Sequence, residues 1–113
     1  MIVKAYNNGT HNRNGAGYGF KVSNADRDEF FKPEWTSILV ELPEGDEPVE
    51  VKIDPASFWS ENSRELVSQA IGKWLRRNGL APWHVGNAPV FVLEPIADNR
   101  FRVEKAGKSS SKI

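Results

Sequence analysis

The segment from Trp35 to Ile53 alternates apolar and polar side chains with a period of two on both sides of a turn. One face of each half is apolar: Ile38, Val40 and Leu42 in the first half, and Val49, Val51 and Ile53 in the second. The intervening "PEGDEP" supplies turn residues, and Gly45 is free to adopt a positive φ. This pattern predicts a β-hairpin with one face in the core and one in water, which is typical of an antiparallel sheet.

Four further segments are predicted strands: Ile2–Tyr6, Tyr18–Val22, Pro89–Ile96 and Arg100–Lys105. The last two form a hairpin around residues 97–99, with Phe101 and Val103 facing inward. Between the second strand and the first hairpin, Ser23 has the position of an N-cap with Asp26 three residues later. A short helix is therefore expected there, and Pro33 ends it because proline cannot continue a helix.

The main helix is predicted between Asn62, as its N-cap, and Gly79, as its left-handed C-terminal residue. Asn62 and Glu65 have the spacing of a capping box. An apolar stripe with helical spacing runs along this segment: Leu66, Val67, Ala70, Ile71, Trp74 and Leu75. The chain is thus α+β, a curled antiparallel sheet or incomplete β-barrel of about six strands with one short and one long helix. Its 113 residues suit one domain over 1–105, followed by a disordered tail over 106–113.

Composition narrows the location and chemistry of the chain. It has no cysteine, so disulfides, thiolate nucleophiles and cysteine-based zinc sites are excluded. No run of 18 apolar residues is present, and the first ten residues lack the apolar stretch of a signal peptide. We therefore expect a cytoplasmic protein with no membrane partner.

The net charge of zero conceals a segregation along the chain. Residues 1–22 carry a charge of +3, residues 23–65 carry −8, and residues 66–113 carry +5. If the two basic regions meet in the folded chain, the molecule has one electropositive and one electronegative side. If the charges interleave instead, no such side exists.

The loop "HNRNGAGYG", from His11 to Gly19, is rich in glycine and asparagine. Its glycines precede a strand, whereas a dinucleotide fingerprint follows a strand and opens a helix, and the lysine of a phosphate loop is missing. Two interpretations remain. The loop either holds an anion with backbone N–H groups helped by Asn8, His11, Arg13 and Asn14, or is a mobile hairpin loop.

The end of the main helix supplies a second candidate, with Lys73, Arg76 and Arg77 close to Gly72. Helical spacing places Gly72 opposite the apolar stripe, where glycine costs ~1 kcal/mol relative to alanine. Close approach by a phosphate backbone, a partner helix or the protein's own sheet would explain this glycine. The alternative is that this glycine has no role and that the neighbouring lysine and arginine side chains are simply solvated.

Aromatic and catalytic candidates are few. Trp74 is expected in the core, Trp35 and Trp59 at its edge, and Trp83 either stacks on a nucleic-acid base or packs as a lid. The two histidines, His11 and His84, have no metal-ligand spacing, so neither a metal nor a cofactor is expected.

The order of "GYGFKVSNADRDEFF", "VELP", "IGKWL", "NGLAPW" and "PVFVLEP" resembles a family of small uncharacterised bacterial proteins over residues 15–104. That resemblance implies no activity. The order of elements is also similar to the plant-type DNA-binding pseudobarrel, which target-reading domains of some restriction enzymes use. This second resemblance implies that basic loops contact the major groove, here through Asn8, His11, Arg13 and Asn14.

Together these features predict a bacterial cytosolic binding module without catalytic activity. Its expected partner is anionic, nucleic acid first, held by Asn8, His11, Arg13, Asn14, Lys73, Arg76, Arg77 and Trp83. A protein–protein adaptor using the acidic tip from Glu44 to Glu47 or an exposed sheet edge is the alternative. A small hydrolase built on His11 or His84 is the third possibility.

Overall fold

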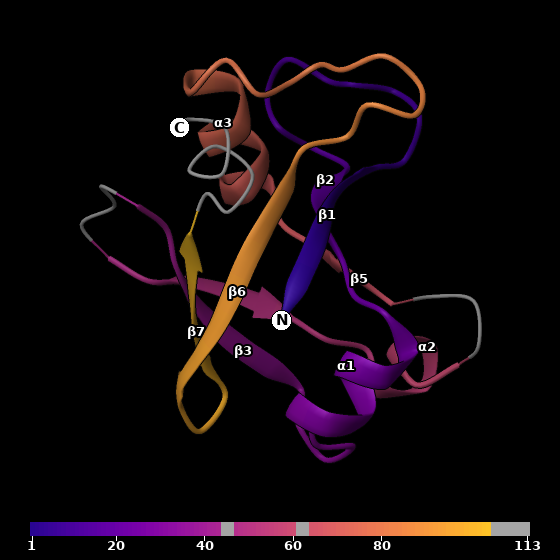
Figure 1. Ribbon diagram of the computed structural model, residues 1–113, viewed down its shortest axis with the longest axis vertical. Coiled ribbons are helices and arrows are strands. Elements are labelled where there is room, and N and C mark those ends of the chain that lie inside the picture. The colour runs from indigo at the N-terminus through magenta and orange to yellow at the C-terminus, as the bar shows by residue number, and fades with distance from the viewer. Residues whose placement is uncertain (44–46, 61–63, 105–113) are drawn as a thin grey trace, which may run out of the picture.

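A computed structural model describes residues 1–43, 47–60 and 64–104 of the chain (Figure 1). Its strands are β1 (Ile2–Asn7), β2 (Tyr18–Lys21), β3 (Ser37–Glu41), β4 (Val49–Lys52), β5 (Glu65–Val67), β6 (Val90–Ala97) and β7 (Arg100–Glu104). Its helices are α1 (Asn24–Phe30), α2 (Pro55–Phe58) and α3 (Gln69–Arg77). The predicted α+β class is confirmed.

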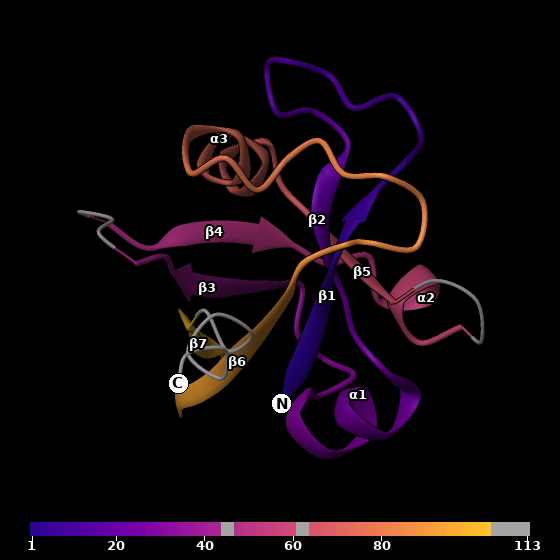
Figure 2. The same ribbon diagram turned by 45° about the horizontal axis from the view of Figure 1, so that its top comes forward.

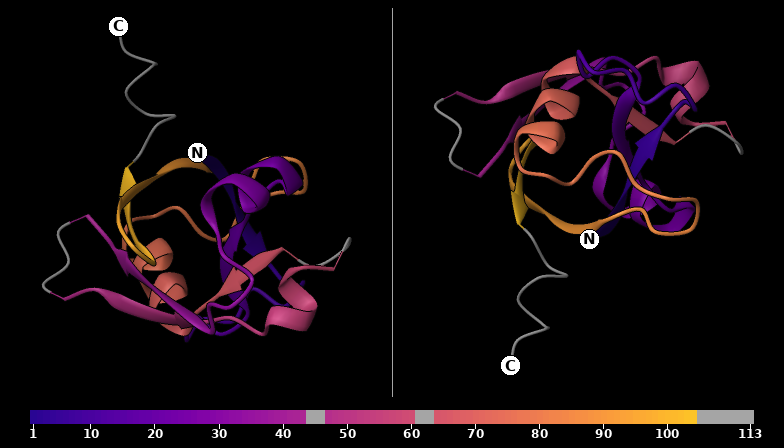
Figure 3. Two further views of the ribbon diagram at one scale, coloured as in Figure 1. Left: turned by 90° about the horizontal axis from the view of Figure 1, so that it is seen from below. Right: turned by 90° about the horizontal axis from the view of Figure 1, so that it is seen from above.

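The seven strands form one sheet in the order β4-β3-β7-β6-β1-β2-β5, and its two outermost strands approach each other. The sheet therefore curls into a nearly closed barrel, as the views along its axis show (Figure 3). The sheet is antiparallel, as expected, except that β3 and β7 are parallel. The β6–β7 hairpin places β7 beside β3, and these two strands run in the same direction. No local sequence pattern predicts this pairing.

The barrel interior is filled by the apolar faces that the alternation predicted. Ile38, Val40 and Val51 of the first hairpin are at most 1% exposed, as is Phe101 of the second. Trp74 reaches this core from α3 and is 1% exposed. Trp35 and Trp59 are half-buried at the core edge, as expected.

Helix α1 forms with the N-cap that the sequence predicts, and a buried arginine connects it to a neighbouring segment. The Ser23 side chain accepts a hydrogen bond from the Asp26 amide. Arg27, only 9% exposed, donates through Nη1 to the carbonyl oxygens of Phe58 at 3.0 Å and Ser60 at 2.8 Å. Its guanidinium also lies 4.8 Å from the centre of the Trp59 ring. One side chain thus joins α1 to the end of α2, a short helix that the sequence pattern did not predict.

The main helix is shorter than predicted, because its first expected turn belongs to the sheet. Residues 65–67 form β5, in which Leu66 pairs with Phe20 of β2 and is fully buried. The helix begins after Ser68, whose side chain accepts the Ile71 amide, and the expected cap Asn62 lies outside the described residues. Val67 is consequently exposed rather than part of a helical stripe.

The helix ends as predicted at Gly79, which has φ +70°. The Gly79 amide donates to the Arg76 carbonyl, and the Leu80 amide donates to the Leu75 carbonyl. These two bonds make a Schellman motif, which satisfies carbonyls that a helix end would otherwise leave open. Among the described residues, no helix is long and apolar enough to cross a membrane. Gly45 of the predicted turn and the tail 106–113 lie outside those residues.

A charged cluster joins β3 to β7 on the outer face of the barrel. The Glu41 carboxylate accepts from Arg100 Nε at 2.8 Å and from Arg102 Nε at 3.4 Å. The hydrogen bond from Arg100 lowers the pKa of Glu41 below its usual value of 4.5, with further lowering from the charge of Arg100 and from Arg102. The cluster stabilises the parallel contact between β3 and β7.

This lowered pKa predicts an acid-sensitive contribution to folding. The folded chain binds the Glu41 proton less readily than the unfolded chain, so the contribution is present above 4.5 and is lost as the pH falls through the folded pKa. Denaturant unfolding from pH 7 to pH 3 should therefore show the difference between wild type and Glu41→Gln shrinking as the pH falls. Glu50→Gln, on the exposed face of β4, is the matched control for the loss of one surface carboxylate. A difference that is constant with pH would contradict the prediction.

Candidate anion-binding surface

Three segments gather at one end of the barrel: the loop 8–17, helix α3 and the loop 78–89 (Figures 1 and 2). We call this surface the basic end, because the three segments contain lysine and arginine but no aspartate or glutamate. Their four permanently charged residues are Arg13, Lys73, Arg76 and Arg77. Parts of the two basic regions of the chain therefore meet in space, Arg13 from the first and the bases of α3 from the second, and the acid-rich α1 lies toward the opposite end (Figure 1).

The loop 8–17 satisfies most of its own amides. Asn7 Oδ1 accepts the amides of Gly9 at 2.7 Å and His11 at 3.0 Å, and Asn8 Oδ1 accepts that of Thr10 at 3.2 Å. Further along the loop, Asn14 Oδ1 accepts the amide of Ala16 at 3.0 Å. The asparagines thus fix the loop's shape, and these N–H groups are already bonded within it. An anion at this surface would be held mainly by side chains rather than by a nest of bare amides.

The loop rests directly on α3, at Gly72. This glycine is buried, so the expectation that it faces solvent is wrong. A Cβ atom at Gly72 would overlap the Gly15 carbonyl oxygen and lie 2.6 Å from the Gly15 Cα. Gly15 has φ +89°, and its own Cβ would lie 2.6 Å from the Gln69 carbonyl oxygen. Of the explanations for this glycine, close approach by the protein's own backbone is the one observed, and the approaching segment is a loop rather than the sheet.

Arg76 fastens this contact. Its Nη2 donates to the His11 carbonyl at 2.6 Å and to the Tyr18 hydroxyl at 3.3 Å, and its Nε donates to the Asn12 carbonyl at 3.1 Å. Gln69 adds a fourth bond, from Nε2 to the Asn14 carbonyl at 2.9 Å. The interpretation of the loop as a mobile hairpin is therefore disfavoured, because α3 holds it at three carbonyls. Arg76 acts here as a positioning residue.

An aromatic cluster closes the barrel beneath the loop. The ring of His11 lies edge-on to Tyr18 and to Trp83, with centroid distances of 5.5 Å and 5.1 Å. His11 Nδ1 lies 2.9 Å from the Tyr18 hydroxyl, which is itself in a fully buried residue. Trp83 is half-buried against this pair, as the lid interpretation expects, and its remaining surface belongs to the basic end.

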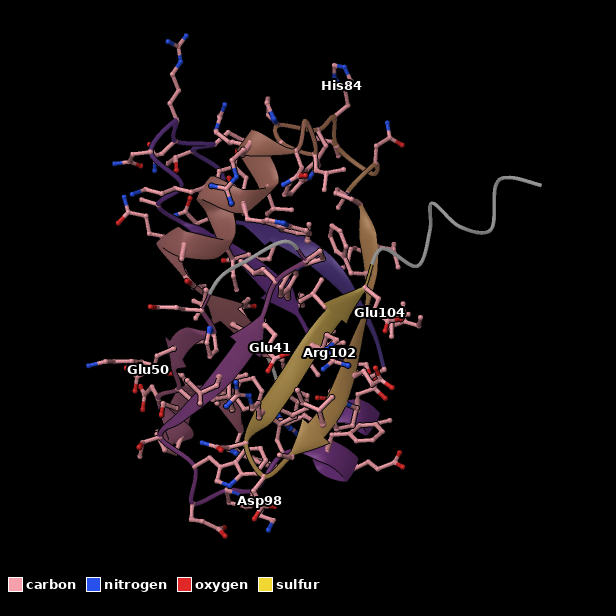
Figure 4. All side chains as sticks on the ribbon, turned by 90° about the vertical axis from the view of Figure 1, so that its left-hand side faces the viewer. Glu41, Glu50, His84, Asp98, Arg102 and Glu104 are labelled. Atoms are coloured by element: carbon pink, nitrogen blue, oxygen red, sulfur yellow. The ribbon has the colours of Figure 1, made fainter. Side chains whose placement is uncertain are left out.

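Of the four charged side chains at the basic end, Arg13, Lys73 and Arg77 face solvent. None of the three has an ion pair with any residue the structure describes. The labelled acids Glu41, Glu50, Asp98 and Glu104 all lie away from this end, whereas His84 projects from it (Figure 4). The described residues around the basic end therefore leave the positive charge of these three side chains without a paired carboxylate. Asn8 and Asn14 are also exposed there, although their amide oxygens serve the loop.

The surroundings of the two histidines bear on the hydrolase alternative. His11 is bonded to a phenol, and no serine, threonine or carboxylate lies within hydrogen-bond distance of either histidine ring in the described part of the chain. Over the same residues no cluster of three or more potential metal ligands occurs. Residues 44–46 of the acidic tip proposed for an adaptor lie outside the description, and Glu47 beside them is exposed.

The site contains two residues that sequence reasoning did not select, Tyr18 and Gln69. Tyr18 occupies a strand position whose pattern indicated only burial, and Gln69 stood within a helix as an ordinary polar residue. Tyr18 is bonded by Arg76 and Gln69 bonds to Asn14, and both partners are distant in the sequence, so no local signal identifies these two residues. Comparison of the chain with protein-family models, with curated proteins and with solved structures gave no match. The two family resemblances therefore stay predictions.

Proposed function

We propose that this chain is a nucleic-acid-binding module whose basic end contacts the phosphate backbone. The observation that carries the proposal is the acid-free surface on which Arg13, Lys73 and Arg77 are exposed without ion pairs among the described residues. Phosphate contacts from lysine and arginine supply most of the affinity of such modules. In a chain with zero net charge, this separation also orients the molecule as it approaches a polyanion.

The residues divide into three roles in this proposal. Arg13, Lys73 and Arg77 bind phosphate oxygens directly, while Arg76 holds the loop that carries Arg13. Trp83, with His11 and Tyr18 behind it, offers an aromatic edge for contact with a base or sugar. The resemblance to the DNA-binding pseudobarrel points to duplex DNA as the first ligand to test.

The test is a titration of the protein into labelled duplex and single-stranded DNA at 50 mM and 200 mM salt. If three phosphates are neutralised, affinity should fall roughly 40-fold between the two salt concentrations. The variant Arg13→Ala/Lys73→Ala/Arg77→Ala should lose most of its affinity at 50 mM salt. Any binding that remains should depend little on the salt concentration.

The charge control is Lys32→Ala/Lys52→Ala, because both lysines are exposed and belong to segments outside the basic end. This variant should bind like wild type. Absence of binding at 50 mM salt would remove nucleic acid as the partner. Equal losses in both variants would show nonspecific attraction rather than a defined surface.

A further inference from the structure

A cavity lies on the side of the barrel, apart from the basic end, where β1 and β2 separate. β1 pairs with β2 only from Lys4 to Asn7, whereas its first residues pair with β6. Beyond Lys21 the chain turns away toward α1 while β1 continues to the N-terminus (Figure 1). The cavity at this fork measures about 270 Å³ and is lined by Ile2, Val3, Lys4, Lys21, Val22, Ser23, Arg64 and Val90.

The cavity has an apolar floor and apolar walls that water reaches. Val3 and Val22 form the buried floor, each 1% exposed. Ile2 is 56% exposed and Val90 is 38% exposed, so two of the large exposed hydrophobic residues of the described chain border the same hollow. Covering this surface removes apolar area from water, which favours a ligand with an aliphatic body.

The rim of the cavity is cationic. Lys4 and Lys21 are direct cross-strand partners, and like charges in that position repel each other. Lys21 is compensated by Glu65, whose carboxylate lies 3.2 Å from its Nζ. Lys4 is exposed and has no ion pair among the residues described. A single anionic group beside Lys4 would relieve the repulsion and neutralise the unpaired ammonium.

We propose that this cavity binds a small aliphatic monocarboxylate. Its carboxylate would lie at Lys4, and its hydrocarbon chain would cover Ile2, Val22 and Val90. The ligand is small because the cavity is just below the roughly 300–1,000 Å³ of ordinary ligand pockets. This site uses neither the residues nor the ligand chemistry of the basic end, so it stands independently of the function proposed above.

The experiment is an amide-resolved NMR titration of the full chain with octanoate, with octylammonium as a probe of equal length and opposite charge. Octanoate should shift the amides of residues 2–4, 21–23 and 90 in a saturable way, and octylammonium should not. Lys4→Glu should abolish octanoate binding, and Lys4→Gln should weaken it about tenfold because the charged contact is lost. Lys52→Glu, an exposed lysine on β4, is the matched control and should leave binding unchanged.

Several results would overturn the proposal. Equal shifts with octylammonium would show that the surface is merely apolar. Undiminished octanoate binding by Lys4→Gln, or shifts centred on the basic end, would place the carboxylate elsewhere. The triple variant of the basic end should retain octanoate binding, so failure of one proposal leaves the other intact.

Discussion

Gly72→Ala should destabilise the protein by about 1–3 kcal/mol, although alanine is the better helix former by ~1 kcal/mol. The added methyl group would overlap the backbone of Gly15, so either the loop or the helix must move. Moving the loop breaks the bonds from Arg76 and Gln69 to loop carbonyls. Denaturant unfolding should show the loss of stability, and amide shifts of residues 8–17 should show the displaced loop.

Ala70→Gly is the matched control, since Ala70 is exposed on the same helix. Because Ala70 is the second residue of α3, the substitution should cost at most about 1 kcal/mol through helix propensity and leave the loop amides unshifted. A stability gain in Gly72→Ala would contradict the observed packing, because only a solvent-facing glycine gains from this substitution. Displacing the loop should also weaken any binding that depends on Arg13.

Arg27→Ala should destabilise the chain by about 3 kcal/mol, which corresponds to a fall in Tm of roughly 10–20 °C. The substitution removes two hydrogen bonds from a buried guanidinium and leaves the carbonyls of Phe58 and Ser60 without their donor. It also removes the cation from the face of Trp59. Thermal unfolding followed by circular dichroism measures the shift.

Asp28→Asn separates the buried bonds of Arg27 from its exposed ion pair. Asp28 accepts from Arg27 Nε at 3.3 Å, but its side chain is 63% exposed. Exposed pairs contribute about 0–1 kcal/mol, so this variant should unfold close to wild type. If Asp28→Asn lost as much stability as Arg27→Ala, the ion pair rather than the carbonyl contacts would hold α1 in place.

The elements that the sequence predicted correctly are those whose signal is local. Both hairpins could be predicted because period-two alternation depends only on neighbouring residues. The helix ends could be predicted because Ser23 and Gly79 bond amides and carbonyls within a few positions of themselves. The sequence did not predict β5, because Leu66 fits both the helical and the strand pattern of apolar residues. The strand forms because its residues pair with an edge of β2 that would otherwise be free. The parallel contact between β3 and β7 depends on the closure of the whole sheet.

The candidate site also combines features that could be predicted from the sequence with features that could not. The bases of the basic end and its lack of acids are properties of composition and could be predicted. Their meeting depends on two backbone segments, at Gly15 and Gly72, that fit only because neither has a side chain. The role of Arg76 could not be predicted, because exposed and loop-bound arginines look the same in a sequence.

The position of β1 in the strand order has a consequence for how the chain folds. β1 is synthesised long before β6, yet it lies in the interior of the sheet and β6 is its partner on one side, with Val92 paired to Ile2. On a ribosome, β1 must therefore wait for most of the chain before that edge is covered. Non-local pairing of this kind slows folding into the millisecond-to-second range. Until β6 emerges, Val3 and Ala5 belong to an uncovered strand edge, and an edge of this kind is a template for pairing with another chain.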